Sequence, residues 1–370
     1  MLLQENIPLA PLTTLGVGGP ARFFVAAATE KDVRDALHFA DGRHLPFFIL
    51  GGGSNLVVAD SGWPGLVLQI ALRGMAEAPS SPSDLDAVLS DIAAQGLAAT
   101  GRFRVAAGED WDAFVAYAVE RGCAGIECLS GIPGTVGGTP VQNVGAYGQE
   151  VSETIAEVIA LDIRSGDIRT FSNEECNFAY RTSVFNTTER SNYIILSVTF
   201  QLRPGGAPRL EYGDLKRHFA AAAEAPTLQQ VRDAVRQVRQ SKAMLIVPGD
   251  EDCRSAGSFF KNPIVTEAKF EQIRRVAAEH GMEPPSFATP QGIKVPAAWL
   301  VEQSGFRKGT ARGAVGISRR HALAIVNRGN ATAADIVEFQ LEIRARVRET
   351  FAIELHPEPV FVGFEFEPAG

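Results

Sequence analysis

The chain has 370 residues, enough for two or three domains, and its 45% hydrophobic and 21% charged content is typical of globular proteins. A net charge of −8 at pH 7 argues against a nucleic-acid-binding protein. The four cysteines form no CxxC pair, so we expect free thiols in a reducing compartment. The sequence begins without a basic region followed by an apolar one, and no run of about 18 apolar residues occurs, so a cytoplasmic protein is predicted.

The first part of the chain is predicted to alternate between strands and helices. Residues 16–21 have G-x-G-x-x-A spacing, but polar and proline-containing residues precede them and an extended pattern follows. This context excludes a Rossmann loop, which must follow a buried strand and open a helix. A helix is predicted over residues 29–40, with Thr29 as its N-cap. A strand at 47–50 then runs into a glycine loop and a second strand at 56–58.

The glycine loop between these two strands has the composition of an anion-binding nest. Gly51, Gly52 and Gly53 allow successive backbone N–H groups to turn toward one point. Ser54 and Asn55 add uncharged donors, and pyrophosphate is the ligand that suits such a loop. A plain hairpin turn is the alternative interpretation. The sequence has no G-x-x-x-x-G-K-[ST] motif, which argues against a P-loop nucleotidase.

The next stretch leads into a strongly apolar helix. The first half of residues 74–101 mixes Ser, Pro and Ala with little strand pattern and is interpreted as a surface excursion. A strand at 103–106 and a helix at 110–121 follow. The buried stripe predicted for this helix consists of Trp111, Phe114, Val115, Ala118 and Val119.

A segment unusually rich in glycine covers residues 125–148 and reads GIECLSGIPGTVGGTPVQNVGAYG, with Glu127 as its only charged residue. So many glycines, together with Pro133 and Pro140, exclude an ordinary helix or strand. The segment is also too apolar for a flexible linker. It suits a backbone that wraps closely around a large uncharged ligand, and a cluster of structural turns inside a core is the alternative.

The second half of the chain predicts a mixed α+β arrangement. Its pattern predicts, in chain order, strands at 155–162 and 193–202, a helix at 227–240 with a capping box, and helices around 267–277 and 332–350. Residues 243–257 lose periodicity and are interpreted as an insertion loop. Residues 294–301 and 322–326 contribute to a compact α+β unit, after which LHPEPVFVG returns to an extended form.

Six motifs, taken in order, identify a family that the chain resembles. They are LGVGGPARF, ILGGGSN, GIPGTVGGTPVQNVGAYG, YRTSVF, SAGSFFKNP and HPEPVFVG. Together they cover nearly the full length and resemble the UDP-N-acetylenolpyruvoylglucosamine reductases, flavoenzymes that make UDP-N-acetylmuramate for the bacterial cell wall. The tyrosine loop at 210–215 is similar to the branch of the family that has a mobile tyrosine over the substrate.

The resemblance implies an α+β fold with a two-subdomain FAD-binding domain of the vanillyl-alcohol-oxidase type and a C-terminal α+β substrate domain. It assigns residues 1–72 to the first subdomain, with 356–370 returning to it. The second subdomain is expected at 73–225 and the substrate domain at 226–355. We expect the protein to be a monomer.

The resemblance also implies FAD as a non-covalent cofactor and NADPH as the co-substrate. Related oxidases can tether the flavin to a His or Cys. Neither lies in the 51–55 loop, and although Cys123 and Cys128 flank the second glycine-rich segment, we expect no covalent bond. The implied cofactor-binding residues are Gly51, Gly52, Gly53, Ser54, Asn55, Ser130, Ile132, Pro133, Gly134, Gly137, Gly138, Asn143, Gly145, Ala146 and Tyr147.

The implied reaction moves a hydride from NADPH through FAD to the terminal vinyl carbon of an enolpyruvyl ether. Protein groups must then stabilise negative charge on the pyruvyl side and deliver one proton to carbon. Arg181 matches the first task, because a guanidinium binds a carboxylate with two parallel hydrogen bonds. Glu358 matches a group that polarises the developing enol, and Ser258 matches the family's proton donor. From the residues alone, each could instead be a structural loop residue.

Five further residues are implied as substrate contacts: Tyr180, Tyr212, Lys242, Asn262 and His321. One branch of the family has Gln at the position of His321, so polarity is kept there while the pH response can differ. The insertion at 243–257 is longer than in that branch and directly follows Lys242, which is implied near the diphosphate. The other histidines show no metal-ligand spacing, so we expect no metal.

Two other functions are weighed against this one. An FAD-dependent oxidase or dehydrogenase of the same superfamily, acting on an alcohol or sugar, would bind the same cofactor but would lack the combined YR, GSFFKNP and PE residues. A module that only senses or stores flavin would not need the three chemical candidates or a substrate domain of about 100 residues.

Overall fold

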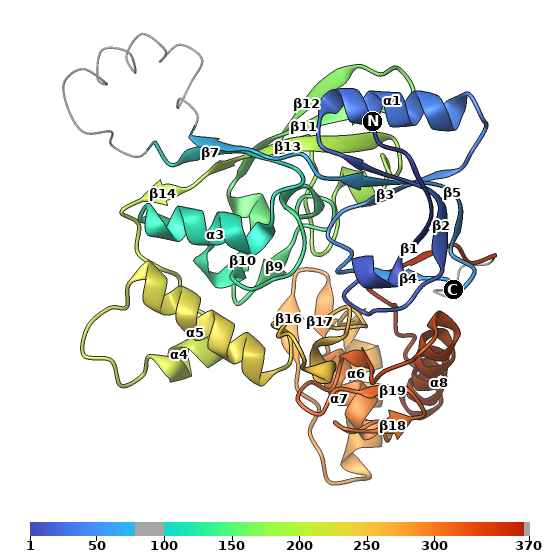
Figure 1. Ribbon diagram of the computed structural model, residues 1–370. Coiled ribbons are helices and arrows are strands. Elements are labelled where there is room, and N and C mark those ends of the chain that lie inside the picture. Colours follow the sequence, from blue (N-terminus) through green and yellow to red (C-terminus); the bar gives the residue numbers. More distant parts are fainter. Residues whose placement is uncertain (78–99, 366–370) are drawn as a thin grey trace. The chain divides into compact units, whose positions relative to one another are not determined.

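The computed structural model describes residues 1–77 and 100–365, and the chain divides into two units (Figure 1). The first unit comprises Met1–Gln4, Phe24–Gly52 and Gly65–Gln240, and the second comprises Glu5–Phe23, Gly53–Pro64 and the residues from Ser241 onward. Most of the predicted surface excursion, residues 78–99, lies outside the described residues, as does 366–370 at the end of the returning segment. The three-part domain division stays a prediction.

The first unit contains a five-stranded antiparallel sheet with the order β12-β11-β13-β7-β6. Its strands are β6 (Met75–Glu77), β7 (Arg102–Ala106), β11 (Ile155–Asp162), β12 (Ile168–Ser172) and β13 (Tyr193–Gln201). The three strands predicted at 103–106, 155–162 and 193–202 are therefore confirmed. Strand β12 has no periodic signal, because Phe171 is its only buried residue.

Helix α3 (Trp111–Glu120) packs its apolar stripe against this sheet. The five residues of the predicted stripe are all buried, and Asp110 caps the helix by accepting a hydrogen bond from the Ala113 N–H at 2.8 Å. The rings of Phe114 and Phe200 lie 4.9 Å apart, which ties the helix to strand β13. Aromatic pairs at such distances add to the free energy gained by burying the rings.

Two further helices of the first unit begin where capping signals predict. Helix α1 (Glu30–Asp41) starts after Thr29, and a full capping box with Asp32 is present. Helix α5 (Leu228–Ser241) starts after a second capping box. There, the Thr227 N–H donates to Gln230 Oε1 at 2.8 Å and the Gln230 N–H donates to Thr227 Oγ1 at 3.2 Å.

The carboxylate of Asp112 joins helices α3 and α5. Arg232 donates to its two oxygens at 2.5 and 3.1 Å, Arg236 donates to it as well, and the Gly131 N–H donates at 2.6 Å. Partial burial alone would raise the pKa of Asp112, but the hydrogen bonds from Arg232 and from the Gly131 N–H, with the two positive charges, lower that pKa overall.

Replacing Asp112 with Asn is expected to lower the free energy of unfolding at neutral pH by about 1–3 kcal/mol, because two arginines lose their charged acceptor. An aspartate whose folded pKa is lowered stabilises the fold above its ordinary pKa of about 3.9 and loses that contribution as the pH falls through the folded value. The difference between the two proteins should therefore shrink below about pH 4. Urea unfolding at several pH values measures this. Asp35→Asn, which removes the partly buried partner of the exposed Lys31, is the matched control and should cost less than about 1 kcal/mol. A difference that persists unchanged at acid pH would contradict the assignment.

A four-stranded sheet has the order β1-β2-β5-β3. Its strands are β1 (Gln4–Pro8), β2 (Pro20–Ala27), β3 (Phe47–Leu50) and β5 (Trp63–Ile70). Strands β3 and β5 run parallel, with Phe47 beside Leu66. The extended pattern predicted after residue 21 and the strand predicted at 47–50 are both confirmed, and β3 passes through the glycine loop to β4 (Leu56–Val58).

The second unit combines short hairpins with three helices. From Ser241 onward, its strands are β15 (Ile264–Val265), β16 (Phe287–Thr289), β17 (Gly292–Lys294), β18 (Ala311–Arg312), β19 (Val315–Ile317), β20 (Ile325–Asn327) and β21 (Val360–Val362). The helices are α6 (Glu267–Ala278), α7 (Ala297–Gln303) and α8 (Ala333–Phe351). The helices predicted around 267–277 and 332–350 are thus confirmed. Strand β21 lies parallel to β4, with Val360 beside Leu56.

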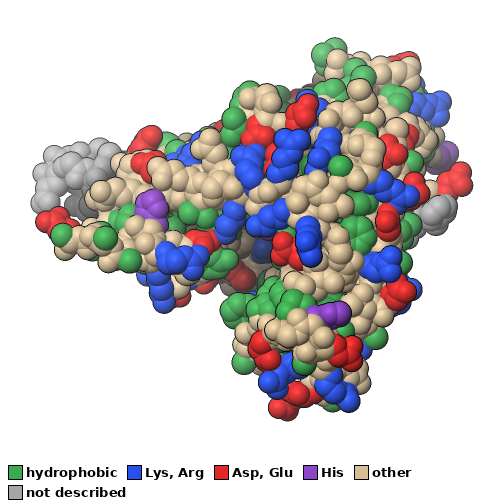
Figure 2. Space-filling view, turned by 90° about the horizontal axis from the view of Figure 1, so that it is seen from below, with side chains coloured by type: hydrophobic (Ala, Val, Ile, Leu, Met, Phe, Trp, Pro, Cys, Tyr) green, Lys and Arg blue, Asp and Glu red, His purple; other side chains and the backbone are tan. Residues whose placement is uncertain are grey.

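The core of this second unit gathers around helix α8. Its fully buried apolar residues include Phe259, Ile273, Leu300, Ile325, Ile336 and Ile343. Further short elements lie in the first unit: β8 (Cys123–Ala124), β9 (Gly145–Ala146), β10 (Gln149–Glu150), β14 (Arg203–Pro204) and α4 (Gly213–His218). On the face seen in Figure 2, basic and acidic side chains are intermixed.

Candidate active site

The glycine-rich segment 125–148 is held against the start of helix α3 by backbone hydrogen bonds. The N–H groups of Val136 and Gly137 each donate at 2.9 Å, to the carbonyl oxygens of Glu109 and Ala107. A Cβ on Gly137 would lie 2.6 Å from the Ala107 Cβ, so only glycine permits this approach. The segment is thus an ordered turn assembly with no long helix or strand, as its composition predicts.

The two glycine-rich segments that the sequence singles out touch each other in the first unit. A Cβ on Gly52 would lie 2.5 Å from the Gly134 Cα, and a Cβ on Gly51 would lie 3.1 Å from the Thr135 side-chain oxygen. The neighbouring atoms are backbone atoms of Gly134 and a hydroxyl close to the Thr135 backbone, which cannot move far. A side chain at position 51 or 52 would therefore force the two segments apart. The structure therefore brings the predicted pyrophosphate loop and part of the predicted flavin segment together.

The backbone of the 51–55 loop has the donor set expected of an anion nest. Among the described residues, none accepts a hydrogen bond from the backbone N–H of Gly52, Gly53 or Ser54. Gly53 is buried and has a φ of +65°, a conformation that turns consecutive N–H groups toward a common side. These neutral donors, without a basic side chain in the loop, fit the diphosphate of a dinucleotide cofactor.

Arg181 lies in a loop that is tied to the glycine-rich segment. Its guanidinium donates to the Gly145 carbonyl oxygen at 2.9 Å, and its backbone has a φ of +57°. Asn143 is 1% exposed and donates to the Ala179 carbonyl oxygen at 3.1 Å and to Glu150 at 2.9 Å. Asn143 therefore holds the loop that carries Arg181, a structural role additional to the cofactor contact predicted for it.

The segment carrying Tyr212 packs on the same part of the first unit. The rings of Tyr147 and Tyr212 lie 5.2 Å apart and nearly perpendicular, while Tyr212 remains 44% exposed. Tyr147 belongs to an apolar cluster with Cys128, Leu215 and Val231. Tyr212 directly precedes helix α4, which the sequence analysis did not predict.

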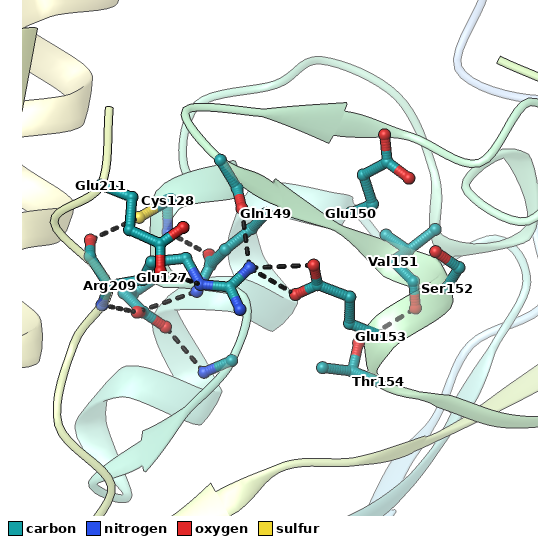
Figure 3. Close-up of polar contacts among 12 residues, drawn as sticks. Glu127, Cys128, Gln149, Glu150, Val151, Ser152, Glu153, Thr154, Arg209 and Glu211 are labelled. Carbon is teal, nitrogen blue, oxygen red and sulfur yellow. Dashed lines mark hydrogen bonds and ion pairs between the residues drawn. The ribbon is translucent and has the colours of Figure 1, made fainter. Parts of the chain in front are cut away.

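Glu127 anchors the residue just before the tyrosine loop at 210–215, a role not predicted from the sequence (Figure 3). This carboxylate is fully buried and accepts hydrogen bonds from the Gly125 N–H at 2.7 Å, Gln149 Nε2 at 2.9 Å and the Arg209 N–H at 2.9 Å. The Arg209 side chain donates to Glu153 at 2.7 and 2.9 Å. The available signal was that Glu127 is the only charge in an otherwise uncharged segment.

In the second unit, backbone pairing brings the chain segments of Ser258 and Glu358 together. The Glu358 N–H donates to the Phe259 carbonyl oxygen at 2.8 Å, and the Lys261 N–H donates to the His356 carbonyl oxygen at 3.0 Å. Asn55 donates from its side chain to the Glu358 carbonyl oxygen at 3.2 Å. Asn55, predicted as a cofactor residue, thus also positions the backbone of Glu358.

The remaining predicted substrate residues occupy different places. Ser258 Oγ lies 3.0 Å from His321 Nε2, so these two candidates are direct neighbours. Asn262 Oδ1 accepts the Ala297 N–H at 2.9 Å, which caps helix α7. Lys242 follows the end of helix α5. Tyr180, Arg181 and Tyr212 belong to the first unit, whereas Lys242, Ser258, Asn262, His321 and Glu358 belong to the second.

All four cysteines are free and buried. Burial raises the pKa of Cys176 to about 12 and raises the pKa of Cys128 further. Over residues 1–77 and 100–365, no three His, Cys, Asp or Glu side chains are grouped as a metal ion would require. None of the helices in these ranges is long and apolar enough to span a membrane.

Two family models match the chain. Residues 248–362 match the C-terminal domain of UDP-N-acetylenolpyruvoylglucosamine reductase, and residues 21–172 match an FAD binding domain. UDP-N-acetylenolpyruvoylglucosamine reductase of Thermobifida fusca is 44% identical over 365 residues, which are 97% of this chain and 98% of that protein. The protein of the same name from Mycolicibacterium smegmatis is 40% identical over 371 residues, covering 98% and 96%. The chain belongs to the UDP-N-acetylenolpyruvoylglucosamine reductase family.

A solved structure agrees with this family assignment. The UDP-N-acetylenolpyruvylglucosamine reductase of Thermus caldophilus has a TM-score of 0.63 and 25% sequence identity, and the match covers 98% of this chain and 100% of that one. The family and the fold class predicted from the six motifs, an FAD-binding domain followed by a C-terminal α+β domain, are confirmed. The chain is an enzyme, a flavin-dependent oxidoreductase of the reductase family.

Proposed function

We propose that this reductase uses NADPH, through bound FAD, to reduce the enolpyruvyl group of UDP-N-acetylglucosamine enolpyruvate and form UDP-N-acetylmuramate for peptidoglycan. The observation that carries this proposal is the backbone pairing that sets Ser258 beside the chain segment of Glu358, in a chain 97% of which aligns with the reductase of Thermobifida fusca. The enzyme would work in the cytoplasm as a monomer and so support cell shape and division.

The residues present fit FAD as the cofactor. The N–H groups of the 51–55 loop would hold its diphosphate, and the segment that includes Ser130, Gly134 and Gly138 would follow the flavin. A Cβ on Gly138 would meet no atom closer than 4.0 Å, so this glycine leaves space that a ring system can use. When bound, FAD supplies the hydride chemistry, and the protein supplies binding, orientation and electrostatics.

Three side chains take the chemical roles. Arg181 would bind the pyruvyl carboxylate. One of its guanidinium nitrogens also donates a hydrogen bond to the Gly145 carbonyl oxygen and so fixes the position of the loop. Glu358 would polarise the developing enol, and Ser258 would give its hydroxyl proton to carbon. The further substrate contacts that the resemblance implies stay proposals: Tyr180, Tyr212, Lys242, Asn262 and His321.

We expect the flavin to be released when the protein is denatured. The four thiols are buried and their pKa values are raised, so a thiolate that could attack the flavin is scarce at neutral pH. Acid precipitation should leave a colourless pellet and a yellow supernatant. A pellet that stays yellow after washing would show a covalent bond.

Steady-state kinetics test the proposed order of reaction. If NADPH and the enolpyruvyl substrate use the flavin in turn, double-reciprocal plots against NADPH at several fixed substrate concentrations should be parallel, as in other ping-pong reactions. Converging lines would show that both substrates must be bound together. Rapid consumption of oxygen with an alcohol or sugar, without the enolpyruvyl substrate, would support the rival oxidase function.

A further inference from the structure

The hydrogen bond between Ser258 and His321 raises the question of which group donates. Ser258 Oγ and His321 Nε2 are 3.0 Å apart and both residues are partly buried in the second unit. A serine that must give its proton to a carbon atom cannot also direct that proton at the imidazole. The productive arrangement therefore has Nε2–H donating to Oγ. The imidazolium and the neutral tautomer protonated at Nε2 can both donate in this way.

The backbone of His321 is held by a buried hydroxyl and a carboxylate. The N–H groups of Arg320 and His321 each donate to Ser318 Oγ at 3.1 Å, and Ser318 is fully buried. Ser318 Oγ in turn donates to Asp252 Oδ2 at 2.7 Å, and the Arg319 N–H donates to Asp252 Oδ1 at 3.1 Å. The turn 318–321 is thus organised around the single carboxylate of Asp252.

The insertion at 243–257 supplies that carboxylate. Asp252 lies in the short 3₁₀ helix Glu251–Cys253, which Asp250 caps by accepting the Asp252 N–H at 3.0 Å. Arg320 pairs with Asp250 and, at 3.3 Å, with Asp252. The insertion and the turn that carries His321 are therefore fixed to each other by charge-assisted hydrogen bonds.

We propose that His321 is a positioning residue: it donates Nε2–H to Ser258 Oγ, so that the serine O–H points at the substrate, and Asp252 fixes it in that place. The inference rests on the proposed function, in which Ser258 protonates carbon. In that step the serine O–H bond breaks, a C–H bond forms, and the serine oxygen later takes a proton from water. In this step His321 is the neutral imidazole protonated at Nε2, which keeps its own proton and stabilises the charge that develops on Oγ.

The tautomer can be read without measuring activity. In the flavoprotein labelled with ¹⁵N-histidine, long-range ¹H–¹⁵N spectra should show a protonated Nε2 for His321, assigned by its absence in His321→Gln. The signal should shift in Ser258→Ala, where its acceptor is lost. A His321 protonated only at Nδ1 would overturn the inference.

Variants at position 321 separate donation from size and charge. The second half-reaction is the reoxidation of the reduced flavin by the enolpyruvyl substrate. His321→Gln keeps an N–H donor, so the rate of this half-reaction should stay within about threefold of the wild-type rate. His321→Leu cannot donate, and His321→Glu can only accept when ionised, so each should slow the second half-reaction at least about tenfold. The flavin absorbance of each purified variant, relative to its protein absorbance, shows whether it is folded. A Glu variant as fast as the Gln variant would contradict the proposal.

A double-mutant cycle tests whether Asp252 acts by holding His321 in place. Asp252→Ala should slow the second half-reaction in the native background but have little further effect in His321→Leu, because both act through Ser258. Glu251→Ala, which removes an exposed carboxylate from the same turn, is the control and should change nothing. Full additivity would overturn the role of Asp252. If flavin reoxidation is slow in Ser258→Ala but proceeds at the wild-type rate in His321→Leu, only this inference fails. If reoxidation in Ser258→Ala proceeds at the wild-type rate, the proposed role of Ser258 fails first.

Discussion

Replacing Ser258 with Ala is expected to leave flavin reduction by NADPH near the wild-type rate and to slow reoxidation by the enolpyruvyl substrate by at least about 10²-fold, the usual contribution of a positioned acid. The asymmetry follows because the serine hydroxyl is needed only when a proton is delivered to carbon. The hydroxyl lies 3.0 Å from His321 Nε2 and next to the segment of Glu358, so it is already part of an ordered polar group.

Stopped-flow flavin absorbance measures each half-reaction of Ser258→Ala separately. Ser304→Ala is the matched control, since it removes a buried hydroxyl elsewhere in the second unit and should leave both halves unchanged. Replacing Arg181 or Glu358 with Ala should also slow mainly the reoxidation of the flavin by the enolpyruvyl substrate. Arg181→Ala should weaken substrate binding as well. Reoxidation of Ser258→Ala at the wild-type rate would show that another group donates the proton.

Replacing Gly53 with Val is expected to abolish FAD binding. Gly53 has a φ of +65°, and a Cβ there would lie 1.9 Å from the Leu12 carbonyl oxygen, so the loop cannot keep its shape. The collision is with the protein's own backbone rather than with a ligand. Because the neighbouring N–H groups depend on this conformation, the proposed diphosphate site should be lost with it.

The flavin absorbance of purified Gly53→Val, relative to protein absorbance, measures this effect. Gly205→Val is the matched control: Gly205 has a similar φ of +63°, but a Cβ there would meet no atom within 4 Å. It should cost about 1–2 kcal/mol of stability from backbone strain and keep normal flavin content. Normal flavin occupancy in Gly53→Val would show that the loop is only a turn.

Elements specified by local signals could be predicted from the sequence. The caps at Thr29 and Thr227 and the apolar stripe of helix α3 depend on residues three or four apart, and the structure agrees at each. Strand β12 and helix α4 were missed because neither has enough buried residues to give a periodic pattern.

Contacts that join distant parts of the chain could not be predicted in this way. The Asn55 side chain supports the backbone of Glu358, and Ser318 meets Asp252, yet no local pattern links these positions. The family motifs place such residues in one site, but they do not show which hydrogen bonds hold them. The buried carboxylate of Glu127 could be predicted only in part. Its position as the one charge in an uncharged segment indicates a special role, but its partner Arg209 lies far along the chain and no local pattern points to it.

A single turnover of the reduced enzyme shows whether its flavin passes a hydride to the enolpyruvyl group. The enzyme is reduced anaerobically with one equivalent of NADPH, freed of nicotinamide by gel filtration and mixed with UDP-N-acetylglucosamine enolpyruvate. We expect the oxidised flavin spectrum to return without oxygen and mass spectrometry to find one equivalent of UDP-N-acetylmuramate per flavin. A flavin that stays reduced until air is admitted, with the enolpyruvyl substrate recovered unchanged, would contradict this expectation.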